Sequence, residues 1–340
     1  MNRTMNRPSL LWLLSVLALP VLLGVLAAGF GESSVAPGTR GVAGGAAQRS
    51  AGGAPGAAAP NSAVSQRGAE AQDDGQREMR SLAQAYPDRI AELTRREGDW
   101  ALRIDDTWYY WSKGRLLPEQ LRQRWNEYTS YRFYNYSFGL PPLPSLDEED
   151  KRRIAKRIEQ AESSPPLRHG GFLGDLYRAE TRSQTEARIV TVSLMGFEVR
   201  VHERLVGPLA AVDRRVEELA RNEPEIRRFL AGLKEAAGYN WREIAGTRSR
   251  SYHSYGLAVD LIPKSYGGRH TYWRWAMAAN EEWYAIPYEQ RWMVPRQVVQ
   301  AFEEQGFIWG GKWLYFDTMH FEYRPEIIIL ARRNAAGDQR

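Results

Sequence analysis

Two short stretches of sequence decide the fold of this chain: Ser251-Tyr252-His253-Ser254-Tyr255-Gly256-Leu257-Ala258-Val259-Asp260 and Asp317-Thr318-Met319-His320-Phe321-Glu322. Residues 257–262 read as a strand in which Ala258, Asp260 and Ile262 share one face and Leu257, Val259 and Leu261 lie on the other. In the second stretch, His320 and Glu322 fall on one strand face. A carboxylate inside an apolar strand is costly to bury without a partner or a metal. If Asp260 is considered alone, the alternative to a metal is that its carboxylate accepts hydrogen bonds from a neighbouring loop.

Together the two stretches offer two imidazoles and a carboxylate to a metal, with Asp317 three residues before the last imidazole. An open catalytic zinc site needs this set: three protein ligands, a water and a base beside it. The chain has no cysteine, so disulfides and thiolate ligands are excluded and a metal must use His, Asp or Glu. The other three histidines have no comparable surroundings and are expected to be structural or surface residues: His169, His202 and His270.

The pattern around these stretches predicts an α+β domain over residues 170–335, with a small antiparallel sheet and flanking helices that carry the zinc site. Strands are expected at 187–195, 197–201, 307–313 and 319–323. Helices are expected at 210–221, 222–238 and 295–305.

The N-terminal half reads as three further segments. Residues 1–31 contain basic residues followed by a long apolar run, which is typical of a signal peptide or a signal anchor. Residues 32–76 are rich in Gly, Ala, Ser and Pro and are expected to form a disordered spacer. Residues 78–165 are expected to be a smaller, mostly helical accessory region rich in aromatic residues. A helix at 88–96 and a hairpin at 100–111 are expected there.

The aromatic side chains of this accessory region allow two interpretations, either internal packing or a platform for sugar rings or peptide. The net charge of +5 is spread over mixed acidic and basic residues without a basic stripe. We therefore expect no nucleic-acid partner.

The pattern Ser251-x-His253-x-x-Gly256-x-Ala258-x-Asp260, followed by Asp317-x-x-His320-Phe321, resembles the zinc peptidases that cut peptidoglycan stem peptides. This family contains D-alanyl-D-alanine carboxypeptidases of the vancomycin-resistance type and L-alanyl-D-glutamate endopeptidases of phages and bacteria. The resemblance covers roughly residues 185–326. It implies the hedgehog/D,D-peptidase type of fold, with zinc bound by His253, Asp260 and His320 and with Asp317 as general base.

The resemblance also bears on the bond that is cut. The vancomycin-resistance type usually has a glutamate where this chain has Asp317, which favours the endopeptidase branch. The run Trp309-Gly310-Gly311-Lys312-Trp313 is similar to Trp-Gly-Gly-Asp-Trp of that branch, although Lys312 departs from it. The expected activity is therefore an L-alanyl-D-glutamate-type endopeptidase. The alternatives are a D-alanyl-D-alanine carboxypeptidase and a non-catalytic wall-binding protein on the same fold.

The remaining site residues follow from the same resemblance. Arg248 resembles the upstream arginine that holds a substrate carboxylate or carbonyl, and Arg250 is the competing choice. Ser251 and Trp309 are expected to contact substrate or to brace the metal site. The substrate lies outside the membrane, so the protein is expected in the cell envelope, with the membrane as a partner if residues 1–31 are not cleaved.

Overall fold

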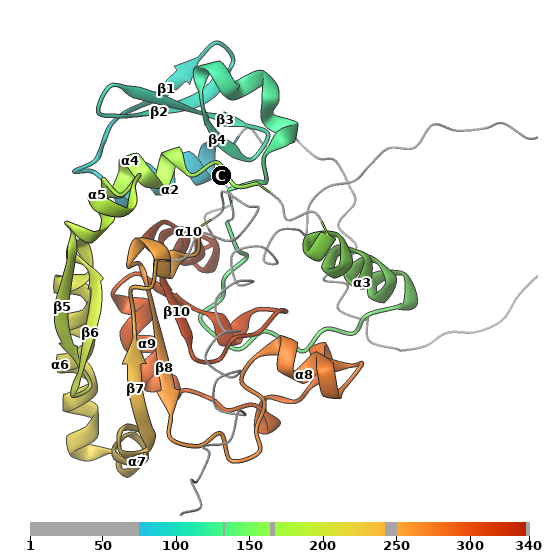
Figure 1. Ribbon diagram of the computed structural model, residues 1–340, viewed down its shortest axis with the longest axis vertical. Helices are drawn as coiled ribbons and strands as arrows, with labels where there is room; N and C mark the ends of the chain where they lie inside the picture. Colours follow the sequence, from blue (N-terminus) through green and yellow to red (C-terminus); the bar gives the residue numbers. More distant parts are fainter. Residues whose placement is uncertain (1–74, 132, 164–166, 242–249, 338–340) are drawn as a thin grey trace, which may run out of the picture. The chain divides into compact units, whose positions relative to one another are not determined.

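The computed structural model describes residues 75–131, 133–163, 167–241 and 250–337 (Figure 1). The expected signal segment, nearly all of the spacer and Arg248 lie outside these residues. Within the described ranges, no helix is both long and apolar enough to cross a bilayer.

The sheet that carries the two decisive stretches is antiparallel and has four strands in the order β7-β8-β10-β9. Its strands are β7 (Leu233–Ala237), β8 (Ala258–Pro263), β10 (His320–Tyr323) and β9 (Phe307–Trp309). The register places His320 of β10 directly opposite Asp260 of β8. Pairing two central strands in this way brings residues 60 positions apart in the chain to one point.

Helices and a hairpin flank this sheet, so the α+β prediction is confirmed. The hairpin turns at Met195 and Gly196, whose φ angles are 53° and 83°. The elements are β5 (Ile189–Leu194), β6 (Phe197–His202), α4 (Gly171–Tyr177), α5 (Arg182–Glu186), α6 (Val206–Asn222), α7 (Pro224–Gly232), α8 (Trp273–Ala279), α9 (Arg296–Glu304) and α10 (Pro325–Ala335). Short 3₁₀ turns cover Glu203–Leu205, Tyr252–Tyr255, Trp283–Ala285, Tyr288–Gln290 and Gly310–Lys312.

Two expected boundaries in this domain are wrong. The helix expected over 222–238 ends at Gly232, because the next five residues pair with β8 as strand β7. Gly238 does not end a helix but meets strand β6 closely: a Cβ there would lie 2.2 Å from the carbonyl oxygen of Arg200. The strand expected over 307–313 stops at Trp309 and continues as a 3₁₀ turn.

The accessory region is organised around a second antiparallel sheet, in the order β1-β2-β3-β4. Its elements are α2 (Gln76–Ala85), β1 (Ile90–Arg96), β2 (Asp99–Ile104), β3 (Thr107–Ser112) and β4 (Arg115–Pro118), then a 3₁₀ segment (Glu119–Glu127) and α3 (Glu148–Ser163). The hairpin expected over 100–111 is confirmed by the pairing of β2 with β3.

The helix expected over 88–96 is wrong, because this segment pairs with β2 as strand β1. Glu97 and Gly98 form the tight turn between the strands with φ angles of 50° and 90°. The expectation of a mostly helical region therefore missed the sheet at its centre.

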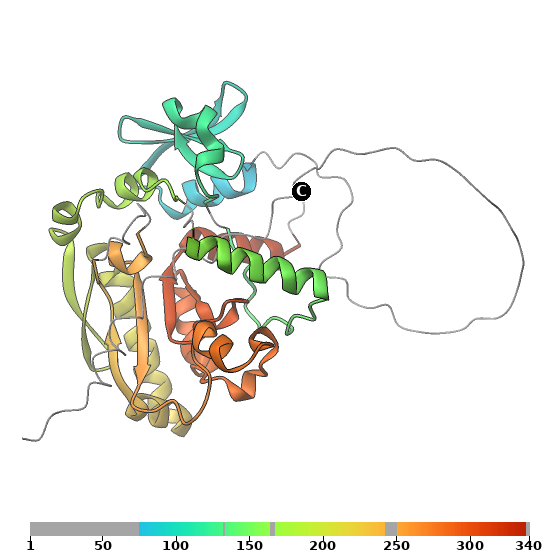
Figure 2. The ribbon, with the colours of Figure 1, turned by 45° about the vertical axis from the view of Figure 1, so that its right-hand side comes forward.

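The two sheets share one hydrophobic core. Tyr86, Leu102 and Trp111 of the accessory region belong to the same buried cluster as Val259 and Phe302. Helix α2 lies between the β1–β4 sheet and α10 in both ribbon views, and Arg333 of α10 donates to Gln84 of α2 (Figures 1 and 2).

The aromatic residues that follow the β1–β4 sheet largely pack inward. Tyr136 is 6% exposed, and Tyr131 and Phe133 pack against the core. This arrangement favours the packing interpretation over a platform for ligands.

Candidate metal centre

His253 is placed by a short 3₁₀ turn, Tyr252–Tyr255, immediately before β8. The hydroxyl of Ser251 begins this turn by accepting a hydrogen bond from the backbone N–H of Ser254 at 3.4 Å. Gly256 ends the turn in the left-handed region with a φ of 70°, and a Cβ there would lie 2.6 Å from the backbone nitrogen of His202. The Ser-x-His-x-x-Gly spacing is therefore the sequence of a tight turn that presents His253 beside the strand.

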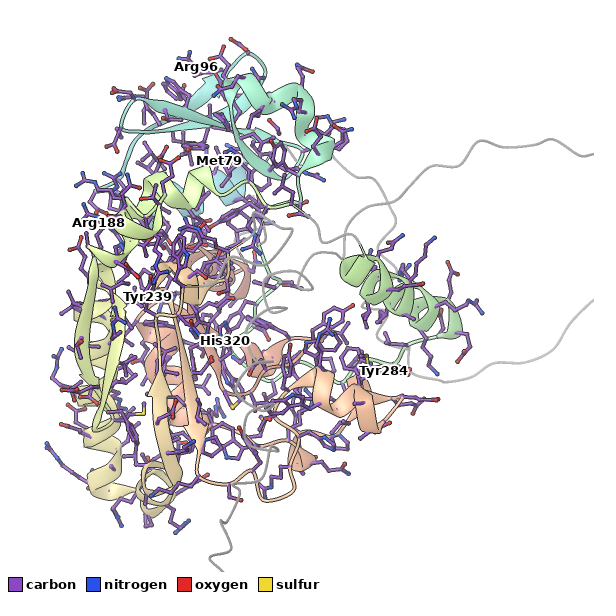
Figure 3. The ribbon with its side chains drawn as sticks, viewed as in Figure 1. Met79, Arg96, Arg188, Tyr239, Tyr284 and His320 are labelled. Carbon is purple, nitrogen blue, oxygen red and sulfur yellow. The ribbon has the colours of Figure 1, made fainter. Side chains whose placement is uncertain are left out.

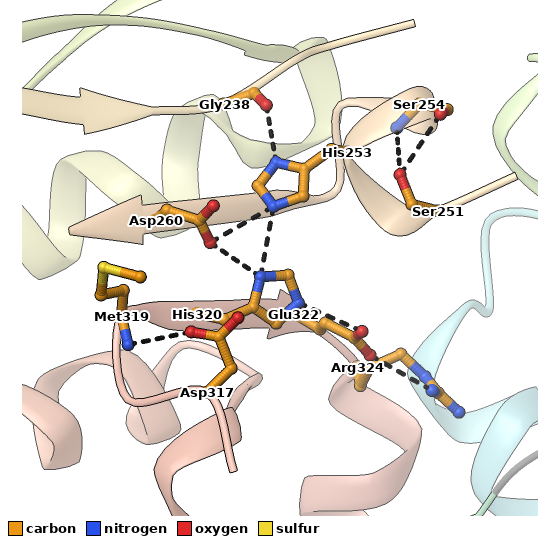
Figure 4. Close-up of polar contacts among 10 residues, drawn as sticks. All are labelled: Gly238, Ser251, His253, Ser254, Asp260, Asp317, Met319, His320, Glu322 and Arg324. Atoms are coloured by element: carbon orange, nitrogen blue, oxygen red, sulfur yellow. Dashed lines mark hydrogen bonds and ion pairs between the residues drawn. The ribbon is translucent and has the colours of Figure 1, made fainter. Parts of the chain in front are cut away.

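Three possible metal-ligand atoms converge at the centre of the sheet, as the close-up in Figure 4 shows; His320 is labelled among the side chains of the whole structure in Figure 3. His320 Nδ1 lies 2.8 Å from Asp260 Oδ1 and 3.2 Å from His253 Nε2, and the third side, from His253 Nε2 to Asp260 Oδ1, is 3.3 Å. Ligands about 2.0–2.1 Å from a tetrahedral zinc lie roughly 3.3 Å apart. The triangle therefore has nearly the size of one face of a zinc tetrahedron.

The outer nitrogens of both histidines fix which ring atoms face this triangle. His253 Nδ1 lies 2.7 Å from the carbonyl oxygen of Gly238, which can only accept, so this nitrogen carries a proton. His320 Nε2 lies 3.2 Å from a carboxylate oxygen of Glu322 and is the donor there for the same reason. The inner nitrogens then have lone pairs that face each other and the Asp260 carboxylate. Three acceptors at this separation require a cation between them, and a metal ion fits.

The electrostatics of the metal-free site agree with this assignment. Burial raises the pKa of Asp260, but the neighbouring His253 and His320 lower it more, and the net pKa is below its usual value. Burial lowers the pKa of His320, but hydrogen bonds with Asp260 and Glu322 reverse the effect and leave the pKa well above its usual value. In the absence of metal, both shifts favour a proton within the triangle, and metal binding there would release a proton.

The site opens on the side of Asp260. The side chain of Asp260 is 17% exposed, against 6% for His253 and 2% for His320. Asp260 is therefore the most solvent-accessible of the three side chains, and an accessible side is what an open metal site requires.

Asp317 lies beside this triangle and takes no part in it (Figure 4). Its side chain is buried, and its Oδ1 accepts a hydrogen bond from the backbone N–H of Met319 at 3.3 Å. Burial, with a further contribution from the Asp260 carboxylate, raises the pKa of Asp317 to about 7. A carboxyl group whose pKa is close to neutral is suited to take up and release a proton near neutral pH.

The other predicted site residues have supporting positions. Arg250 donates to the carbonyl oxygen of Ala179 at 2.6 Å, and its guanidinium lies 3.8 Å from the ring centre of Tyr255. Trp309 is 2% exposed and donates from Nε1 to the carbonyl oxygen of Thr318 at 2.8 Å, which supports the loop between Asp317 and His320.

Sequence reasoning missed the side chains that hold the ligands in place. Glu322 orients His320, and its second oxygen lies 3.7 Å from Arg324. The strand alternation that puts His320 and Glu322 on one face was the available signal. The carbonyl of Gly238, which orients His253, left no signal because any residue provides a carbonyl.

Comparison with known families agrees with this geometry. Residues 245–323 match a family model described as D-alanyl-D-alanine carboxypeptidase. This stretch contains His253, Asp260, Asp317 and His320. The match supports assignment to this broad family of zinc-dependent peptidoglycan peptidases. Residues 78–133 match a second model, described as a domain of unknown function. Searches of curated proteins and of solved structures returned no match.

Proposed function

We propose that this chain is a zinc-dependent endopeptidase that hydrolyses peptidoglycan stem peptides at L-alanyl-D-glutamate-type bonds. The observation that carries the proposal is the triangle of His253, Asp260 and His320 with a buried, near-neutral carboxyl group beside it. A closed structural site would have no use for a base at that position, and a wall-binding protein would not need one.

His253, Asp260 and His320 would hold the metal, with the ring orientations set by Gly238 and Glu322. Zinc supplies Lewis-acid chemistry and lowers the pKa of water toward about 7. Asp317 takes the proton from the attacking water and passes it to the amine that leaves as the peptide bond breaks. Burial raises the pKa of Asp317 to about 7, so its carboxylate is a stronger proton acceptor than an exposed one and can hold the proton until the amine leaves.

The endopeptidase is preferred over the carboxypeptidase because Asp317 stands where the carboxypeptidase branch usually has a glutamate. Arg250 is engaged with Ala179 and Tyr255, so Arg248 is the candidate for holding the substrate in either reaction.

The second candidate function is a D-alanyl-D-alanine carboxypeptidase, which the description of the matching family favours. The deciding experiment is digestion of intact sacculi with the zinc-loaded protein, followed by mass spectrometry of the muropeptides. Cleavage between alanine and glutamate supports the endopeptidase, whereas release of single D-alanine supports the carboxypeptidase. Hydrolysis that chelation leaves unchanged, or a purified protein without zinc, would contradict both.

We further propose that the site acts outside the membrane. The apolar run in residues 1–31 and the Gly-, Ala-, Ser- and Pro-rich stretch at 32–76 support this location, because a leader of this kind directs the rest of the chain across the membrane, where peptidoglycan lies.

A further inference from the structure

A buried group of charged and phenolic side chains connects the metal site to the accessory region; we call it the Arg324 cluster. It consists of Glu322, Arg324, Glu326, Tyr86 and Tyr131. Arg324 Nε donates to Glu326 Oε1 at 2.5 Å, and Arg324 Nη1 lies 3.7 Å from Glu322 Oε2. Glu322 is in turn bonded to the ring of His320, so the cluster begins at a metal ligand.

The two tyrosines of the cluster come from the accessory region. Tyr86 donates to Glu326 Oε2 at 2.8 Å, and Tyr131 donates to Glu326 Oε1 at 3.3 Å. The guanidinium of Arg324 also lies 5.1 Å from the ring centre of Tyr131. Figure 4 shows this guanidinium extending from the metal site toward the blue-green ribbon of the accessory region.

Burial makes these contacts necessary. Arg324 is 1% exposed, Glu326 is 0% exposed and Tyr86 is 1% exposed. A buried carboxylate that loses a hydrogen-bond donor relies on the donors that remain, because no water replaces the lost one. If Glu326 loses its tyrosine donors, Arg324 is the donor that remains, and its guanidinium is drawn toward Glu326 and away from Glu322.

Glu322 is the group that transmits this change. One of its oxygens accepts from His320 Nε2 and the other faces Arg324, so a shift of Arg324 changes the position of the carboxylate behind His320. A carboxylate behind a metal-bound histidine sets the orientation of the ring, and its loss lowers metal affinity about 10–100-fold.

We propose that residues 78–133, the domain of unknown function, support the metal site, and that Tyr86 and Tyr131 are positioning residues for His320. In this assignment the accessory region completes the metal-binding site. The inference depends on metal binding at His253, Asp260 and His320, which the proposed function shares, but it does not depend on the bond that is cut.

The test compares zinc affinity in the full chain by competition with a chelator. The double variant Tyr86→Phe/Tyr131→Phe removes both hydroxyls and keeps both rings, and we expect its zinc affinity to fall about three- to tenfold, less than for the direct partner variant Glu322→Gln. The d–d absorption bands of the cobalt-substituted protein should also shift, because they report on the ligands themselves.

The matched control is Tyr109→Phe. Tyr109 of β3 also donates from the accessory region to a carboxylate across the interface, Asp175, at 2.6 Å. The Tyr109→Phe variant therefore loses the same kind of hydrogen bond without changing the Arg324 cluster. Its zinc affinity and cobalt spectrum should equal those of the unmodified chain. If the double variant does not fold, the single variant Tyr131→Phe, which removes the longer bond, takes its place.

Equal zinc affinity and equal cobalt spectra in the tyrosine variants and the Tyr109→Phe control would overturn the inference. Failure of the proposed function has a different signature. In that case the unmodified chain binds zinc, the tyrosine variants bind it more weakly, and no member of the series releases muropeptides.

Discussion

Two buried clusters of polar side chains differ in whether they contain their own cation. In the first, Lys312 donates to Glu303, and Tyr136 donates to the same carboxylate at 2.6 Å. Lys312 also donates to the carbonyls of Ser137 and Phe138. The positive charge of Lys312 balances the negative charge of Glu303, so we call this the complete cluster.

In the second cluster, the inner nitrogens of His253 and His320 and the carboxylate of Asp260 converge without any lysine or arginine among them. These three side chains offer only acceptors, so a cation that binds them comes from solution, and we call this the incomplete cluster. The first cluster is therefore a structural ion pair, whereas the second has the composition of a cation-binding site. The structural role also accounts for Lys312, which departs from the Trp-Gly-Gly-Asp-Trp pattern, because its amine attaches residues 137 and 138 to the domain that carries the candidate metal site.

The largest effect is expected for His253→Ala, which removes one corner of the triangle. Zinc affinity should fall more than about a hundredfold, since even the loss of an outer partner costs 10–100-fold. Zinc at a hundred times its dissociation constant stabilises a protein by about 2.7 kcal/mol. Thermal unfolding with and without zinc should show this gain in the unmodified chain and not in the variant. An equal gain in both would place the metal elsewhere.

The next effect concerns the base and not the ligands. Asp317→Asn should lower the rate of muropeptide release by about 10²–10⁴, the usual contribution of a general base, while zinc stays bound. Metal content and turnover are measured on the same sample. The matched control is Asp213→Asn. Asp213 of α6 also accepts a hydrogen bond from a methionine backbone N–H, that of Met195 in the β5–β6 turn, at 2.6 Å. A variant that loses zinc along with activity would make Asp317 a structural residue of the site.

Lys312→Met breaks the complete cluster and should have the opposite pattern. Removing one partner of a buried pair leaves an uncompensated charge and costs about 3–5 kcal/mol of unfolding free energy. Burial already raises the pKa of Glu303, and loss of the lysine raises it further above that of the unfolded chain. Stability is then retained at low pH and lost as the pH rises through the folded-state pKa, so the deficit should be larger near about pH 8 than near about pH 5.

Denaturant titrations at both pH values, with a zinc-affinity measurement beside them, check this prediction. Glu303→Gln/Lys312→Met removes both charges and should recover most of the loss. If Lys312→Met weakened zinc binding as strongly as it weakened folding, the two clusters would not be separable.

The sequence was sufficient to predict that His253, Asp260 and His320 lie together, and insufficient for the accessory region and its contacts. His253, Asp260 and His320 could be predicted because ligand chemistry restricts the residue types and the tight turn at Gly256 restricts the spacing. The strand at Ile90–Arg96 could not, because its sequence does not alternate strictly and its conformation is decided by pairing with β2. The bond from Tyr86 to Glu326 joins residues 240 positions apart, and no local pattern records such a contact.

The smallest effect is expected in the segment between the two decisive stretches, at the aromatic side chains Tyr266, Tyr272 and Trp275. Trp275 is 41% exposed and makes edge contacts with Tyr272 and Tyr266, at 5.6 and 6.1 Å between ring centres. Tyr272 pairs with Asp317 through an isolated bridge, and the Tyr266 hydroxyl lies 3.7 Å from the sulfur of Met319. Trp275 is therefore an exposed ring that contacts a neighbour of Asp317, and a substrate can stack on such a ring.

Trp275→Ala should raise KM for muropeptides roughly fivefold, which corresponds to about 1 kcal/mol of stacking, and leave kcat unchanged. Val206→Ala is the control, because Val206 is 44% exposed at the start of α6 and should leave both constants unchanged. Steady-state kinetics on purified muropeptides distinguish the two variants. A fall in kcat with constant KM would mean that Trp275 acts on Asp317 through Tyr272, and the ring would then belong to the support of the base and not to the binding of substrate.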